Sequence, residues 1–163
     1  MRFSRQIVAF AGIMALGSGF ETLQAQTATQ TVTFSVVPIN RVAVSGSAGP
    51  IVVSTATAGS APTSASMGGS SYAITTNETN QKISAALDQP MPAGVSLAVA
   101  LGAPSGASST GSMLLSTASA DVVTGISSVS ASALPIVYTL SATATAPVAP
   151  GTRTVTFTVS AGQ

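Results

Sequence analysis

The sequence feature that most constrains the fold is a strict alternation of apolar and hydroxyl side chains near the C-terminal end of the chain. Val155, Phe157 and Val159 occupy every second position, and threonine or serine fills the positions between and after them. A period of two places one set of side chains on each face of a β-strand, and β-branched residues suit the pleated backbone. Residues 151–160 therefore predict a strand with one buried face and one solvated face.

A second segment, residues 29–37, has almost the same pattern. Val32, Phe34 and Val36 alternate there with threonine and serine, and Pro38 follows. We expect this segment to form the first strand, with its three apolar side chains facing inward. Proline has no backbone N–H to donate, so a break at Pro38 is typical of a strand at a sheet edge.

The rest of the chain reads as short strands separated by turns that contain glycine and proline. The clearest alternation lies in residues 95–101, where four apolar side chains occupy every second position. Residues 72–76 and 81–87 predict a hairpin around the polar residues 77–80. Residues 58–71, which are rich in serine, glycine and alanine, predict a surface loop. Further strands are expected in residues 40–45, 51–55, 112–116, 122–123 and 134–145.

These strands predict the fold class. Beyond the N-terminal segment, no window of the sequence has a sustained helical period. About eight or nine short strands with turn signals between them predict an all-β fold, a single antiparallel β-sandwich of immunoglobulin-like or Greek-key type. A closed barrel is the alternative. In such a sandwich the first strand commonly meets the last, which would bring residues 29–37 and 152–160 together at one edge.

The first residues have the features of a secretory signal peptide. Arg2 and Arg5 supply a positive start, an apolar run follows, and residues 23–25 resemble a cleavage site. The apolar run is about 10 to 14 residues, shorter than the roughly 18 to 20 that cross a bilayer. We expect residues 1–25 to be removed, which leaves 26–163 as one domain without a membrane span; a retained membrane anchor is the alternative. The product is expected to be secreted, displayed on the cell surface or held in the periplasm.

The composition removes most kinds of catalytic and metal chemistry. The sequence contains no histidine, cysteine or tryptophan, so it lacks the side chains of nucleophilic triads, of imidazole or thiolate zinc sites and of haem ligation. Glu78, Asp88 and Asp121 are the only carboxylate side chains in residues 26–163, and they lie in or beside different predicted loops. We expect a protein that is not an enzyme and that binds no cofactor or metal. A weak calcium site at Asp88 and Asp121 is the alternative.

Few charges are present. In residues 26–163, Arg41, Lys82 and Arg153 balance the three carboxylates. This balance leaves no basic surface for nucleic acid. A net charge near zero also weakens the repulsion between copies, which favours association.

The most polar segment, residues 77–82, is the candidate for recognition of a ligand. The candidate binding residues are Tyr72, Asn77, Glu78, Asn80 and Lys82. Tyr72 is the remaining aromatic residue for stacking on a carbohydrate. Asn77 begins an Asn-Glu-Thr triplet that fits N-glycosylation, and Lys82 is a candidate for an isopeptide bond to an asparagine. A solvated hairpin turn without a binding role is the alternative.

The chain resembles secreted bacterial all-β surface proteins, including pilin-like and WxL-type cell-surface domains. The resemblance rests on the export signal, the opening Thr-Val-Thr-Phe-Ser-Val segment, the middle rich in small residues and the closing Thr-Val-Thr-Phe-Thr-Val segment. Without tryptophan the chain lacks the Trp-x-Leu signature, and it lacks the cysteine pair frequent in chaperone-assembled pilins. The resemblance implies a surface or structural role and assigns no site residues.

We therefore expect a non-catalytic structural protein, pilin-like or coat-like, that associates with itself or with other envelope components. If residues 29–37 detached, they could pair with residues 152–160 of a neighbour, since an edge strand offers unpaired backbone groups. Ordinary pairing within one chain is the alternative. The other functional class is a monomeric binding or adhesin module that recognises a carbohydrate or a protein through residues 77–82.

Overall fold

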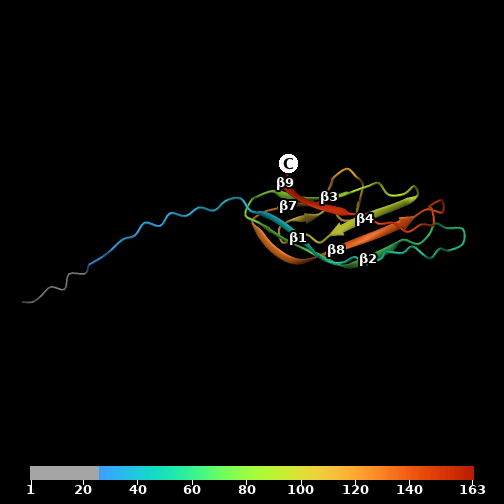
Figure 1. The fold of residues 1–163 in the computed structure, drawn as a ribbon, viewed down its shortest axis with the longest axis horizontal. Coiled ribbons are helices and arrows are strands. Elements are labelled where there is room, and N and C mark those ends of the chain that lie inside the picture. The colour runs from blue at the N-terminus through green and yellow to red at the C-terminus, as the bar shows by residue number, and fades with distance from the viewer. Residues whose placement is uncertain (1–25) are drawn as a thin grey trace, which may run out of the picture. The chain divides into compact units, whose positions relative to one another are not determined.

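Alternating apolar side chains build two antiparallel β-sheets that pack face to face in the computed structural model, which describes residues 26–163 (Figure 1). The five-stranded sheet has the order β1 (Asn40–Gly46), β2 (Ala65–Thr76), β8 (Val129–Ala142), β4 (Val95–Leu101) and β6 (Met113–Leu114). The four-stranded sheet has the order β5 (Ser108–Ser109), β7 (Ala120–Ile126), β3 (Gln81–Leu87) and β9 (Val155–Ala161). The predicted all-β sandwich is confirmed.

The described residues form no helix, and so none that is long and apolar enough to cross a membrane. The sandwich lies within the compact unit of residues 36–163. The expected signal peptide, residues 1–25, lies outside the described residues and stays a prediction.

The core consists of the inward side chains of both sheets. Ile83 and Ala85 of β3 and Val99 of β4 are fully buried, as expected from their alternation. The apolar core residues are Tyr72, Ile74, Ile83, Ala85, Leu87, Leu97, Val99, Leu101, Leu115, Val122, Val123, Ile126 and Ile136. Burial of one such side chain contributes about 1.5–3 kcal/mol to folding. The predicted strands at residues 81–87 and 95–101 are confirmed with the same bounds.

The predicted hairpin of residues 72–76 and 81–87 is wrong. β2 pairs with β1 and β8, whereas β3 pairs with β7 and β9. The four residues between them carry the chain from one sheet to the other, and Asn80 takes a positive φ of 52° in this turn. The two strands therefore lie in different sheets, on opposite sides of the core.

The predicted surface loop at residues 58–71 is too long, because β2 already begins at Ala65. Its first residues pair with β8, and the register shifts between Met67 and Ser70. Gly69, with a φ of 101°, allows this irregularity. The strand predicted at residues 51–55 does not form.

Residues 29–37, which we call the N-terminal arm, do not form the predicted first strand. Residues 26–39 are neither helix nor strand, and all of them are exposed. Val32, Phe34 and Val36 are 73%, 86% and 77% exposed, so the expectation that they face a core is wrong. The strand expected after Pro38 does form, as β1, and it pairs with β2.

Candidate functional site

Asn77 holds the chain at the point where the N-terminal arm meets β1. Its Oδ1 accepts a hydrogen bond from the N–H of Ile39 at 2.8 Å, and its Nδ2 donates to the C=O of Val37 at 2.9 Å. Its backbone N–H also donates to the C=O of Ile39, at 3.2 Å. These three bonds hold both sides of Pro38. Asn77 therefore anchors the root of the arm.

The other polar residues of this turn also bond within the domain. The carboxylate of Glu78 accepts a hydrogen bond from the side-chain amide of Asn40. The hydroxyl of Thr76 donates to the same amide group of Asn40 at 2.6 Å and accepts from the N–H of Glu78 at 3.1 Å. The N–H of Asn80 donates to the hydroxyl of Ser127 at 2.9 Å. The bonds to Asn40 tie the start of β1 to the turn between the sheets, and the bond to Ser127 ties this turn to the connection between β7 and β8.

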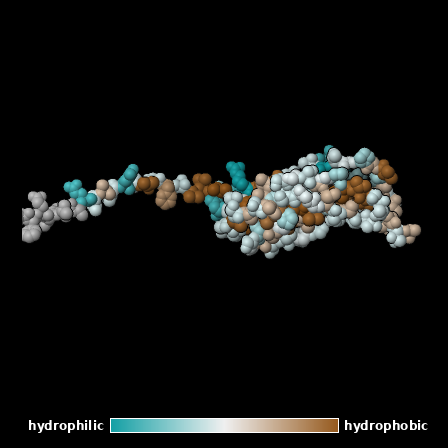
Figure 2. Space-filling model, turned by 90° about the horizontal axis from the view of Figure 1, so that it is seen from below, coloured by the Kyte–Doolittle hydropathy of each residue, from teal (hydrophilic) through white to brown (hydrophobic). Residues whose placement is uncertain are grey.

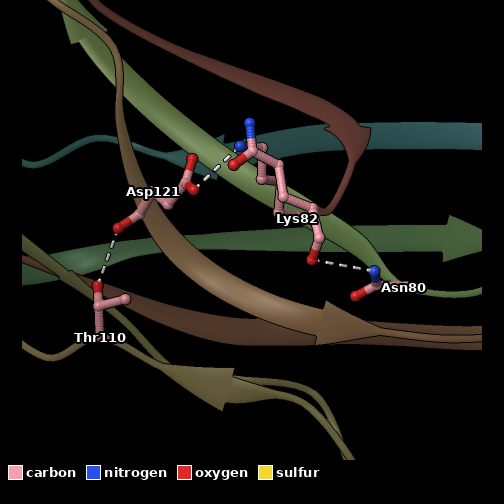
Figure 3. Close-up of polar contacts among 5 residues, drawn as sticks. Asn80, Lys82, Thr110 and Asp121 are labelled. Carbon is pink, nitrogen blue, oxygen red and sulfur yellow. Dashed lines mark hydrogen bonds and ion pairs between the residues drawn. The ribbon is translucent and has the colours of Figure 1, made fainter.

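Lys82 lies on the outer face of β3, as its position in the alternation predicts. Its Nζ is 3.0 Å from Oδ2 of Asp121 on β7 (Figure 3). The hydroxyl of Thr110 donates to the backbone C=O of Asp121 at 3.1 Å. The side chains of Lys82 and Asp121 are 21% and 41% exposed, and solvated pairs of this kind contribute about 0–1 kcal/mol. The partner of Lys82 is an aspartate, and the burial that an isopeptide bond to an asparagine needs is missing.

Tyr72 is not a surface residue, which corrects its candidacy as a stacking platform for a carbohydrate. Its side chain is 1% exposed, in the core between the sheets. The hydroxyl donates to the backbone C=O of Gly102 at 2.6 Å. The ring faces inward because it continues the alternation of β2 with Ile74, and the hydrogen bond satisfies its one polar group.

The Tyr72 hydroxyl makes stability depend on pH in the alkaline range. Burial raises the pKa of Tyr72 from 10.0 to about 12, and burial also raises the pKa of Tyr138. The unfolded chain therefore loses these protons first, so stability is fully present below about pH 10 and falls as the pH rises towards 12. The expected loss from Tyr72 is about 1.4 kcal/mol per pH unit across this window.

Urea unfolding at a series of pH values measures this loss, and Tyr72→Phe provides the comparison. The variant lacks the titrating group, so its stability should depend less on pH above about pH 10. An equally steep decline in Tyr72→Phe would assign the loss to another group.

The carboxylates have separate partners. Oδ1 of Asp88 accepts a hydrogen bond from the N–H of Thr154 at 3.0 Å, Asp121 faces Lys82, and Glu78 binds the Asn40 amide. Within residues 26–163, no three acidic, histidine or cysteine side chains gather as a metal site would require. Each of the three carboxylates is therefore engaged in a hydrogen bond or an ion pair within the domain.

The last strand, β9, is the open edge of the four-stranded sheet. It pairs with β3 on one side, and no strand among the described residues pairs with its other side. Its inward residues Val155, Phe157 and Val159 pack against the core but stay only half-buried. In contrast, the three inward apolar residues of β3 are at most 5% exposed. The predicted pairing of the N-terminal arm with β9 within one chain is not present.

One face of the sandwich carries few strongly polar residues. Figure 2 shows this face, which is covered mainly by weakly polar residues, with scattered apolar ones and few strongly hydrophilic ones. Hydroxyl pairs join neighbouring strands on the outer face, such as Ser66 with Thr139 at 2.9 Å and Ser45 with Ser71 at 3.1 Å. β9 itself has no charged residue, so charge does little to protect the open edge from other strands.

The structure thus separates the predicted candidate residues. Asn77, Glu78 and Asn80 share the turn between the sheets, Lys82 lies on the outer face, and Tyr72 is buried. The role of Asn77 at the arm root was missed, since its partners lie about forty positions earlier in the sequence. The sequence matches no family model, and a search of curated proteins finds no significant match.

Proposed function

We propose that this protein is a non-catalytic structural subunit, exported from the cell, that assembles with copies of itself through the N-terminal arm. The observation that carries the proposal is the exposure of Val32, Phe34 and Val36, between 73% and 86%. These side chains lie on one face of an extended segment that would form a strand if it found a partner. An apolar surface of this kind marks a site of interaction.

An open sheet edge of a neighbouring copy supplies the second half of an assembly contact. A strand at a sheet edge has unpaired N–H and C=O groups, which another extended segment can bind. Because the three basic and three acidic side chains of residues 26–163 balance, electrostatic repulsion between copies is weak. The sequence pattern of the export signal supports a place outside the cytoplasm, and the missing histidine and cysteine support a role without catalysis.

The expected affinity is moderate. Burial of each of the three arm side chains contributes about 1.5–3 kcal/mol. The loss of translational and rotational freedom on association costs about 4–15 kcal/mol, so apolar burial alone does not produce tight binding. Main-chain hydrogen bonds and repeated contacts have to add to it, and assembly should therefore depend strongly on protein concentration.

Removal of the arm tests the proposal. The chain of residues 26–163 should form polymers visible by electron microscopy and a rising mass by light scattering as the concentration increases. A chain lacking residues 26–37 should stay monomeric and keep its fold, because none of the removed residues is buried. A chain lacking only residues 26–28 is the matched control and should assemble normally. If the chain of residues 26–163 and the arm-deleted chain are both monomeric at all concentrations, the proposal is wrong.

A monomeric binding or adhesin module remains the second candidate. A shallow depression beside the arm root favours it, lined by Ile39, residues 75–77 and residues 128–130. Against it, the side chains of Asn77, Glu78 and Lys82 already bond within the domain. Monomers at every concentration, together with binding of a glycan or protein that Thr75→Arg blocks, would favour this module over the structural subunit.

A further inference from the structure

We infer that the N-terminal arm of one copy binds β9 of a second copy as an added strand. This inference rests on the proposed function and identifies its acceptor. In the added strand, Val32, Phe34 and Val36 face inward beside Val155, Phe157 and Val159. The partner is thus another molecule of the same chain, and the contact surface is the open side of β9.

Length excludes two of the four sheet edges as acceptors. β5 and β6 are edge strands of two residues each, whereas β1 and β9 have seven residues each. The arm alternates over residues 29–37 and needs a long edge to satisfy its backbone groups. Only β1 and β9 offer such an edge among the described residues.

Charge and side-chain pattern favour β9 over β1. β1 carries Arg41, and a charged side chain on an edge strand disfavours the docking of another strand. Its first residue, Asn40, is engaged with Thr76 and Glu78. β9 has no charged residue, and its inward side is an unbroken valine, phenylalanine and valine series.

The two faces of the arm match the two faces of β9. An added strand would cover the exposed parts of the half-buried residues Val155, Phe157 and Val159, and cross-strand aromatic and β-branched pairs contribute about 0.2–1 kcal/mol each. The arm's hydroxyl residues would then continue the hydroxyl face of β9. A shift of the pairing register by one residue would move the Phe34 side chain from the buried face to the solvent-exposed face. The alternation therefore sets which face of the arm is buried.

The root of the arm favours a second copy over the same chain. Asn40 pairs with Thr76, and Ala161 pairs with Gln81, so β1 begins at the end of the sandwich where β9 ends. An arm that docked on its own β9 would have to reverse direction between Val37 and Asn40. Asn77 holds this stretch by hydrogen bonds on both sides of Pro38. We therefore place the arm on a neighbour, which joins two different surfaces and produces open, head-to-tail chains.

Engineered cysteines test the acceptor, because the chain has no cysteine of its own. A tagged chain of residues 26–163 with Thr33→Cys is mixed under mild oxidation with untagged chains that carry Thr156→Cys, Thr158→Cys or, as the matched control on β1, Ala43→Cys. All four positions are exposed and leave the apolar residues intact. Neighbouring strands lie about 4.7–4.9 Å apart, within the range that a disulfide bridges.

The expected result is a disulfide between chains with at least one β9 position, at least tenfold more abundant than the disulfide with Ala43→Cys. If the chains assemble but the disulfide forms preferentially with Ala43→Cys, or equally with all three positions, β9 is not the acceptor and the proposed function still stands. The double variant with Thr33→Cys and Thr158→Cys tests whether the arm binds its own chain. If its disulfide forms within one chain at high dilution, faster than disulfides form between chains in assemblies, the acceptor is not a second copy. Failure of the unsubstituted chain to assemble would overturn the proposed function itself.

Discussion

Phe34→Asp is expected to abolish assembly while the thermal stability of the sandwich stays unchanged. Phe34 is 86% exposed and contributes nothing to the core of its own chain, so the fold should tolerate the change. In an assembled pair, the substitution removes about 1.5–3 kcal/mol of apolar burial and adds the cost of burying a charge. A total loss of about 3 kcal/mol or more corresponds to roughly a hundredfold weaker association.

Sedimentation velocity at several concentrations measures this effect, and Thr33→Asp is its matched control. The control introduces the same charge one position away, on the face of the arm that we expect to remain in water. It should assemble nearly as well as the unsubstituted chain. Equal loss of assembly in both variants would show that charge alone matters, and unchanged assembly in Phe34→Asp would contradict a buried arm.

Ile83→Ala is expected to cause the largest loss of stability. Ile83 is 0% exposed in β3, the strand that pairs with β7 on one side and β9 on the other. Truncation of a buried isoleucine to alanine costs about 2–5 kcal/mol, because it removes packing and leaves a cavity. This loss is a large part of the roughly 5–15 kcal/mol that separates folded from unfolded domains.

Chemical unfolding followed by circular dichroism measures this change against Val52→Ala. Val52 is 64% exposed in the loop after β1, so its truncation should change stability by less than about 0.5 kcal/mol. The absence of cysteine means that no disulfide can compensate for the lost packing. A similar, small loss in both variants would contradict the core position of Ile83.

Local alternation predicted part of the fold correctly. It failed where contacts with distant segments of the chain determine the structure. Residues 81–87 and 95–101 were predicted with their observed bounds because their period of two is unbroken. The hairpin around residues 77–80 was wrong, since a short turn connects strands of one sheet or of two sheets equally well. Residues 65–71 have only one large apolar side chain, Met67, so the local pattern does not predict a strand, and their pairing with β8 determines their structure.

The candidate site was also predictable only in part. The alternation of residues 29–37 predicted a strand, but the pattern alone does not say whether the same chain supplies its partner. The open edge of β9 depends on strand order, which is a property of the whole sheet. Tyr72 is a surface candidate in the sequence, but its place in the β2 alternation turns it inward, where its hydroxyl donates to the C=O of Gly102.

Amide hydrogen exchange of the chain of residues 26–163, measured by mass spectrometry in dilute and concentrated samples, tests the central claim most directly. If the arm becomes a strand of a neighbour, the amides of residues 31–37 and of β9 should exchange slowly in the assembled sample, and those of the arm should exchange freely in the dilute one. Equally fast exchange of the arm in both samples, at a concentration where polymers are present, would contradict the claim.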